Sequence, residues 1–295
     1  MNASFVLLAL PAAFGYTLAA LFLKQALERG TSGSFVNLFV NLVTALLFQL
    51  MLLFDRRPFD WPEIWQPVSV GLLFLAGQVL TFLAFSRGDI GVAAPLLGSK
   101  TLFVVLLVSL VTLQPLAGRW WIASGLCALG VFLIGGGASR FQLTPSARIA
   151  MAAALTSAFC FAFADTLLQL WTPHFGIGAF VPILFATVGI GSPLYSLCFE
   201  RRLIRLPPPA AWRPLLIGTI ILASQAFVLC LAIVLSRDAA AANILYATRT
   251  VLSVLAVAVI GRWMGLRDVS GTPGIFRQRL IGAILIFGAV LLALL

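Results

Sequence analysis

The chain alternates between long apolar segments and short polar ones. Each apolar segment is close to the roughly 20 residues that a helix needs to cross a membrane. The longest polar interruptions are residues 55–66, 200–212 and 262–278, and none is long enough for a separate domain. We therefore predict ten membrane-spanning helices, at residues 4–24, 34–54, 67–86, 90–112, 119–137, 148–169, 177–199, 213–235, 239–260 and 279–295.

The composition supports this interpretation. Of the 295 residues, 61% are hydrophobic and 9% are charged, whereas a soluble domain carries about 25% charged residues. Lipid offers no partners to open backbone groups, so helices that satisfy their own hydrogen bonds are the economical solution. The predicted fold class is an all-α, multi-pass membrane protein, and we expect it in the cell's inner (plasma) membrane.

The net charge of +10 does not indicate nucleic-acid binding. Lysine and arginine residues stand at the ends of apolar segments and in short loops, as the positive-inside bias of membrane proteins predicts. Most of them follow the odd-numbered segments. This count predicts that both chain ends lie outside the cytoplasm.

Two segments of the chain resemble each other. Residues 86–101 (SRGDIGVAAPLLGSKT) align with residues 236–250 (SRDAAAANILYATRT) with one gap. The first predicted helix, with FGYTLAALFLKQ from Phe14, likewise resembles the sixth, with FCFAFADTLLQL from Phe159. These pairs occur in the same order, which predicts two related five-helix repeats.

The expected boundaries are a first repeat at 1–138, a connecting loop at 139–147 and a second repeat at 148–295. An odd number of helices makes the second repeat enter the membrane from the opposite side. Inverted repeats of this kind are typical of secondary transporters, whose substrate site lies near the midplane between the halves.

Lys100 and Arg249 fall inside the fourth and ninth predicted helices, at aligned positions of the two repeats. A charge at the bilayer centre costs about 2.5–3.5 kcal/mol even on the lenient insertion scale, so both should face a cavity. An arginine fork suits a carboxylate or phosphate, and lysine offers a point charge. Together they predict a site for an anion; pairing with an internal acid is the structural alternative. Hydroxyl neighbours of the two cations are further candidate ligands: Ser99, Thr101, Thr248 and Thr250.

Other polar residues within the predicted helices have two interpretations each. Gln78 and Gln225 occupy matching positions and would either bind a solute or join helices. Tyr246 lies one turn before Arg249 and is a candidate for the wall of a pocket. Asp165, near the end of the sixth predicted helix, would be a coupling carboxylate or a salt-bridge gate.

Acid–base pairs precede the fourth and ninth helices: Arg87 with Asp89, and Arg237 with Asp238. They are candidates for gating ion pairs, although pairs at a membrane edge usually contribute little. The four cysteines lie in apolar runs, and His174 stands beside Pro173 in a predicted loop. No metal-ligand spacing or catalytic motif is present. We therefore expect no enzyme activity, no cofactor and no metal.

The ten short helices in a five-plus-five repeat, with FGYTLAALFLK and FCFAFADTLLQ in the first and sixth, resemble the EamA-like branch of the drug/metabolite transporter superfamily. The resemblance implies alternating access, with helices three, four, eight and nine lining the cavity. It also implies that Lys100 and Arg249 occupy the helices whose basic residues meet the phosphate in related sugar-phosphate carriers. Family habit places both chain ends in the cytoplasm, against the charge count.

The sequence hypothesis is a secondary active transporter of a small anionic or zwitterionic metabolite. An exporter of hydrophobic or aromatic compounds or of amino acids, and a lipid or lipid-phosphate flippase, remain as alternatives. The expected partners are a small anionic substrate and the lipid bilayer, without nucleic acid; a homodimer is left open.

Overall fold

The computed structural model describes residues 3–53, 61–87, 96–113, 116–135, 145–199, 206–259 and 273–295. All regular elements in these residues are helices. Asp89, one member of a predicted gating pair, lies outside the described residues.

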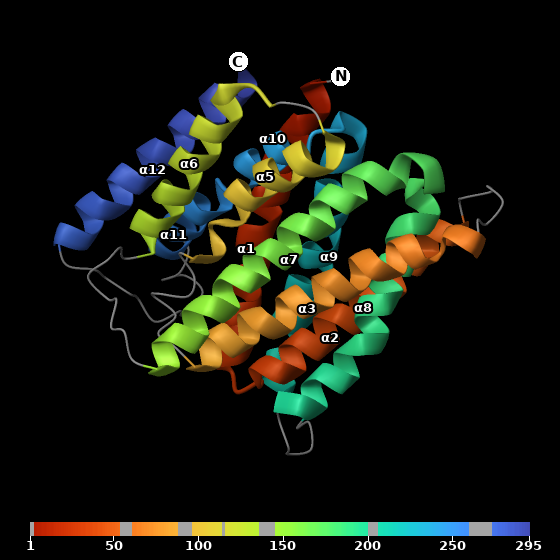
Figure 1. The fold of residues 1–295 in the computed structure, drawn as a ribbon. Helices are drawn as coiled ribbons and strands as arrows, with labels where there is room; N and C mark the ends of the chain where they lie inside the picture. Colours follow the sequence, from red (N-terminus) through yellow and green to blue (C-terminus); the bar gives the residue numbers. More distant parts are fainter. Residues whose placement is uncertain are drawn as a thin grey trace.

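Figure 1 shows the elements of the two halves along the chain. The first half holds η1 (Ala3–Leu8), α1 (Ala9–Glu28), α2 (Gly33–Gln49), η2 (Leu50–Leu53), η3 (Trp61–Glu63), α3 (Trp65–Arg87), α5 (Lys100–Thr112) and α6 (Gly118–Ile134). The second half holds α7 (Pro145–Phe175), α8 (Ile177–Phe199), α9 (Pro209–Ser236), α10 (Ala239–Tyr246), α11 (Arg249–Val259) and α12 (Pro273–Leu294).

Seven helices in the described residues are long and apolar enough to cross a membrane. Three shorter apolar helices accompany them, at Lys100–Thr112, Gly118–Ile134 and Ile177–Pro193. Each predicted span overlaps one of these helices. The chain is therefore a multi-helix membrane protein, and the crossing of the bilayer by all ten segments stays a prediction.

The sixth predicted helix is longer than expected. α7 begins at Pro145, inside the predicted connecting loop, and continues through Pro173 to Phe175. Gly176, at φ +90°, ends it, and its N–H donates to the Thr172 carbonyl at 2.8 Å. The placement of His174 in a loop was wrong, because the glycine and not the proline stops the helix. Asp165 accordingly lies ten residues before the helix end rather than near it.

The ninth predicted helix is not continuous. α10 ends at Tyr246 and α11 begins at Arg249, with a turn at Ala247 and Thr248 between them. Residues 98–99 form the corresponding turn before Lys100 at the start of α5. The expectation of unbroken helices was wrong at both places. At the second turn, backbone bonds tighten to the i→i−3 pattern: Thr248 N–H donates to Leu245 at 3.2 Å and Thr250 N–H to Ala247 at 3.0 Å.

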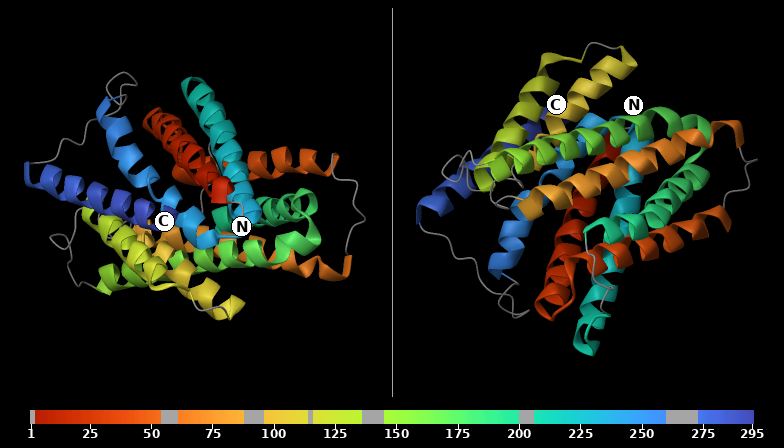
Figure 2. Two further views of the ribbon diagram at one scale, coloured as in Figure 1. Left: turned by 90° about the horizontal axis from the view of Figure 1, so that it is seen from above. Right: turned by 60° about the horizontal axis from the view of Figure 1, so that its bottom comes forward.

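The two halves pack against each other through reciprocal helix pairs. α1 lies along α9, and α3 lies along α7 (Figure 2). If the halves are exchanged, the first pair maps onto the second. The pairs α2–α8 and α6–α12 map onto themselves. This reciprocal pattern is what two related halves packed about a two-fold axis would give, and the inversion of the second repeat stays a prediction.

The contact between α6 and α12 is reciprocal at the level of atoms. A Cβ added to Gly130 would lie 2.7 Å from the carbonyl oxygen of Gly282, and one added to Gly282 would lie 2.6 Å from that of Gly130. Ile286 and Ile134 flank the two glycines in the same exchanged way. Only glycine permits this approach of the two backbones.

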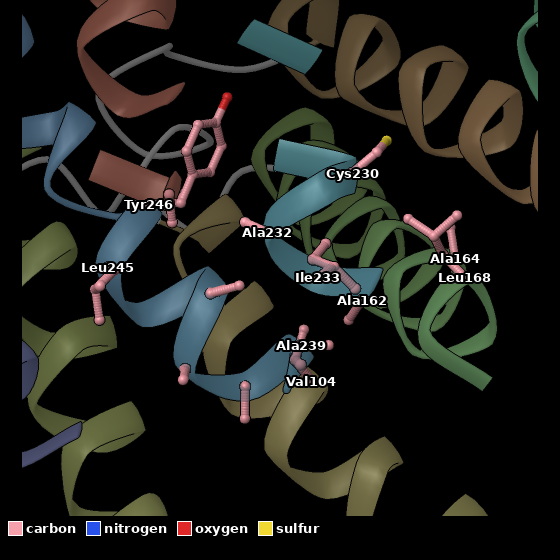
Figure 3. Close-up of a cluster of buried hydrophobic side chains, with 14 of the residues drawn as sticks. Val104, Ala162, Ala164, Leu168, Cys230, Ala232, Ile233, Ala239, Leu245 and Tyr246 are labelled. Atoms are coloured by element: carbon pink, nitrogen blue, oxygen red, sulfur yellow. The ribbon is translucent and has the colours of Figure 1, made fainter. Parts of the chain in front are cut away.

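The main core lies where α5, α7, α9 and α10 meet (Figure 3). Small side chains dominate it, including Ala162, Ala232 and Ala239, with Val104 and Ile233 between them. Alanine at helix crossings lets backbones approach closely, which is the main source of packing energy when lipid surrounds the helices. This core fixes α10, and therefore the turn before Arg249, relative to α5 and α7.

Candidate substrate-binding site

A cavity of about 360 Å³ lies between the two halves. Its walls come from α1, the end of α3, residues 97–101, α6 and both parts of the α10–α11 segment. The lining residues are Tyr16, Phe85, Leu97, Gly98, Lys100, Thr101, Val131, Ile134, Gly135, Asn243, Tyr246, Ala247, Arg249, Thr250, Ser253 and Val254. Both predicted cations therefore share one cavity.

Arg249 packs between two aromatic rings. Its guanidinium carbon is 4.4 Å from the centroid of Tyr16 and 4.4 Å from that of Tyr246. The two rings contact each other edge to face at 6.0 Å, and the Tyr246 hydroxyl donates to the Gln225 side-chain oxygen at 2.9 Å. No carboxylate of the described residues forms an ion pair with Arg249.

Lys100 has a different environment. Its Nζ is 2.7 Å from Oδ2 of Asp165, with the lysine side chain 18% and the aspartate side chain 11% exposed. The same oxygen accepts a hydrogen bond from Nδ2 of Asn243 at 2.8 Å. One carboxylate oxygen offers enough acceptor positions to receive both donors at once. The sequence predicted that Lys100 would either bind an anion or pair with an internal acid. The structure contains the pairing with an internal acid.

The two cations thus occupy equivalent positions of the two halves, but only Lys100 is paired with a described carboxylate. Lys100 Nζ lies 5.9 Å from the ring centroid of Phe161, and Phe161 aligns with Tyr16, the ring beside Arg249. Asp165 aligns with Ala20, so the arginine lacks a counterpart of the carboxylate. The pair Lys100–Asp165 is neutral, so among the described residues Arg249 leaves the cavity with one positive charge that no ion pair compensates.

The hydroxyl candidates divide into two groups. Thr101 and Thr250 line the cavity. Ser99 and Thr248 are not among its lining residues and instead donate to the carbonyls of Leu96 and Leu245, each at 2.7 Å. These two residues sit in the turns before α5 and α11, where a hydroxyl satisfies a carbonyl that the broken helix leaves open.

The two glutamines are not among the lining residues either. Gln78 exchanges hydrogen bonds with Asn41, at 2.7 and 3.2 Å, and Asn41 also donates to Ser192 at 2.8 Å. These bonds join α3, α2 and α8. Gln225 holds the hydroxyl of Tyr246 from α9. The helix-joining interpretation therefore describes what both amides do, and Gln225 acts on the cavity only through Tyr246.

The predicted gating residues lie away from the cavity lining. Arg87 ends α3, and its carbonyl accepts a hydrogen bond from Ser146. Asp238 caps α10 by accepting from the Ala241 N–H at 2.9 Å. Burial raises the pKa of its carboxyl, while backbone N–H groups and Arg119 act in the opposite direction. No ion pair joins Arg237 to Asp238 in this part of the chain.

Sequence reasoning missed part of the cavity wall. Tyr16 lies in the FGYTL segment that revealed the repeat, but only the fold brings it to Arg249. Asn243 lies one turn before Tyr246 on the same helix, and this spacing was the one available signal for it. Helix α9, the eighth predicted span, contributes no lining residue in the parts described, although the resemblance implied one, and α1 and α6 contribute instead.

Comparisons with known proteins place this geometry in context. The EamA-like transporter family matches residues 3–136. Twenty-eight chains of solved structures match this one. One of them, described only as a crystal structure of a protein, has a TM-score of 0.77 and 18% identity over 99% of this chain and 97% of its own. At that identity the likeness concerns the fold alone. No curated protein matches the chain.

The family match covers the five predicted spans of the first half, which contribute Tyr16, Lys100 and Thr101 to the cavity. The solved structure shares the arrangement of both halves. Residues 3–136 match the EamA-like transporter family of the drug/metabolite transporter superfamily, and together with the apolar helices this match points to a multi-pass membrane transporter.

Proposed function

We propose that the protein is a secondary transporter of a small organic anion or zwitterion, held in the cavity between the two halves. The observation that carries this proposal is the environment of Arg249. An arginine inside a membrane protein is costly unless a partner neutralises it. Two tyrosine rings lie against it and no described carboxylate forms an ion pair with it, so a bound anion would supply the partner that its guanidinium group lacks.

The position of Arg249 agrees with a site near the membrane midplane. Tyr16, against which it packs, is the thirteenth of the 25 residues from Ser4 to Glu28. A solute that reaches this depth from one side must leave past a similar thickness on the other. Both halves line the cavity, so a movement of one half against the other would open it alternately to the two sides.

The helix breaks favour the same substrate charge. α5 begins at Lys100 and α11 begins at Arg249, and the first residues of both helices line the cavity. Helix N-termini carry a partial positive charge and unpaired N–H groups. Discontinuous helices with such ends are how transporters hold anionic groups.

Thermal stabilisation of the purified protein tests this proposal. We expect organic anions to stabilise the wild-type protein and neutral aromatic compounds of the same size to have little effect, because only the anion neutralises Arg249. The variant Arg249→Gln should lose the response. Arg119→Gln is the matched control, because Arg119 also lies over an aromatic ring, that of Trp120 at 5.3 Å, but is exposed outside the cavity.

Stabilisation by neutral aromatics alone would contradict the proposal and favour the exporter of hydrophobic compounds. Stabilisation by lipid phosphates but not by any water-soluble anion would favour the flippase. An Arg249→Gln protein that keeps the full anion response would remove the observation on which the proposal depends.

A further inference from the structure

Among the described side chains in and directly behind the cavity wall, cations outnumber carboxylates. Lys100 and Arg249 contribute two positive charges, and Asp165 contributes one negative charge through its contact with Lys100 at 2.7 Å. Asn243 supports the carboxylate by donating to Oδ2 at 2.8 Å. The net charge presented by these side chains is therefore +1.

Asp165 acts from behind the cavity wall. It belongs to α7, and it is not one of the residues that line the cavity. A substrate would meet Lys100 and Arg249 but not the carboxylate itself. Asp165 thus sets the charge of the site without occupying space in it.

Part of the cavity lining is apolar. The end of α3, residue 97, α6 and α11 contribute Phe85, Leu97, Val131, Ile134 and Val254. A volume of about 360 Å³ is at the small end of the range for ligand pockets, roughly 300–1,000 Å³. An apolar part of the lining together with a single net charge suits a small molecule with one charged group and a hydrocarbon or aromatic body.

We propose that Asp165 is a specificity-determining residue, and that it restricts the substrate to a singly charged organic anion with an apolar body, such as a small aromatic or branched carboxylate. Phosphate monoesters carry between one and two negative charges near neutral pH, and close to two above it. They would leave excess negative charge in a cavity of net charge +1. This inference rests on the proposed anion transport and names the substrate class of the same site.

Two probes with the same phenyl ring separate the charges: benzoate and phenyl phosphate, at a pH where the phosphate is doubly ionised. The concentration that half-saturates thermal stabilisation is measured for each. We expect the wild-type protein to prefer benzoate. Asp165→Asn raises the net charge to +2 and should shift the preference at least tenfold toward phenyl phosphate, since a unit charge within about 12 Å at an effective dielectric constant of about 20 is worth one decade.

Two further variants keep the experiment decisive. Glu28→Gln is the matched control, because Glu28 also pairs with a lysine, Lys24 at 4.0 Å, but lies at the end of α1; it should leave the preference unchanged. The double variant Lys100→Gln with Asp165→Asn restores a net charge of +1. It should bind more weakly but again prefer benzoate, and a preference for phenyl phosphate in this double variant would show that the net charge does not set the selectivity.

The outcomes separate this inference from the proposed function. A wild-type preference for phenyl phosphate would overturn the role of Asp165 and leave anion transport standing. An unchanged preference in the Asp165→Asn variant would do the same. The absence of stabilisation by either anion would overturn both proposals.

Discussion

At the scale of single residues, equivalent positions of the two repeats hold cations with different partners. Lys100 forms an ion pair with Asp165, whose carboxylate also accepts a hydrogen bond from the Asn243 amide. Arg249 instead packs against two tyrosine rings. Guanidinium groups are less strongly hydrated than ammonium groups and stack on aromatic faces. Arginine is therefore the cation better suited to remain without a carboxylate partner, and lysine the one that requires it.

The ion pair can be tested apart from transport. Lys100→Met leaves the Asp165 carboxylate buried without its cation, and such a loss of one partner typically costs about 3–5 kcal/mol. Asp165→Leu should also destabilise the protein, because it leaves Lys100 unpaired. The double variant should be more stable than the sum of the two predicts, as measured by unfolding of the purified protein in detergent.

Additive effects of the two substitutions would show that Lys100 and Asp165 do not depend on each other. This dependence is also why Arg249, and not Lys100, is the cleaner target for tests of transport. A substitution of Lys100 would lower stability and ligand binding together.

The sequence predicted the chemistry of these residues better than their contacts. Lys100, Arg249 and Asp165 stood out because ionisable residues inside membrane helices are rare. Their partners could not be predicted, because Asn243 and Tyr16 reach them only across helices that are far apart in the chain. Gln78 and Gln225 are likewise polar residues inside predicted membrane helices, but their hydrogen bonds join helices.

At the scale of elements, the breaks before α5 and α11 position both cations. The local sequence gives little warning of the second break, because Ala247 and Thr248 are not helix-breaking residues. Its cause is tertiary. α10 is wholly buried and its packing is fixed by the core, while Thr17 of α1 lies 3.4 Å from both the Arg249 carbonyl and the Ser253 hydroxyl on α11.

The glycine contact between α6 and α12 gives a second test. Gly130→Ala and Gly282→Ala each place a methyl group within 2.7 Å or less of a facing carbonyl, and overpacking of this kind costs about 1–3 kcal/mol. Because the contact is reciprocal, the two variants should lose similar amounts of stability in thermal unfolding.

Each helix supplies its own control for this test. A Cβ at Gly125 of α6 or at Gly288 of α12 meets no atom within 4 Å, so alanine there should cost nothing. Equal stability of the control and contact variants would show that the two backbones are not in close contact.

At the scale of the whole molecule, hydropathy located every helix that could cross the membrane, because twenty apolar residues have few alternatives to a lipid environment. The repeat predicted which helices correspond, and the reciprocal pairs α1–α9 and α3–α7 agree with it. Hydropathy could not predict which helices face the cavity, because lipid-facing and packed faces are both apolar. The two chain ends lie at the same end of the molecule (Figure 1), as an even number of crossings requires; which side of the membrane they face stays a prediction.

Anion flux into liposomes tests the central claim most directly. The purified protein is reconstituted, and uptake of radiolabelled benzoate is followed for wild type, Arg249→Gln and Arg119→Gln. We expect saturable uptake by the wild-type protein and by Arg119→Gln, and uptake no faster than in empty liposomes by Arg249→Gln. Equal, saturable uptake by all three proteins would contradict the claim that the uncompensated charge of Arg249 binds the transported anion.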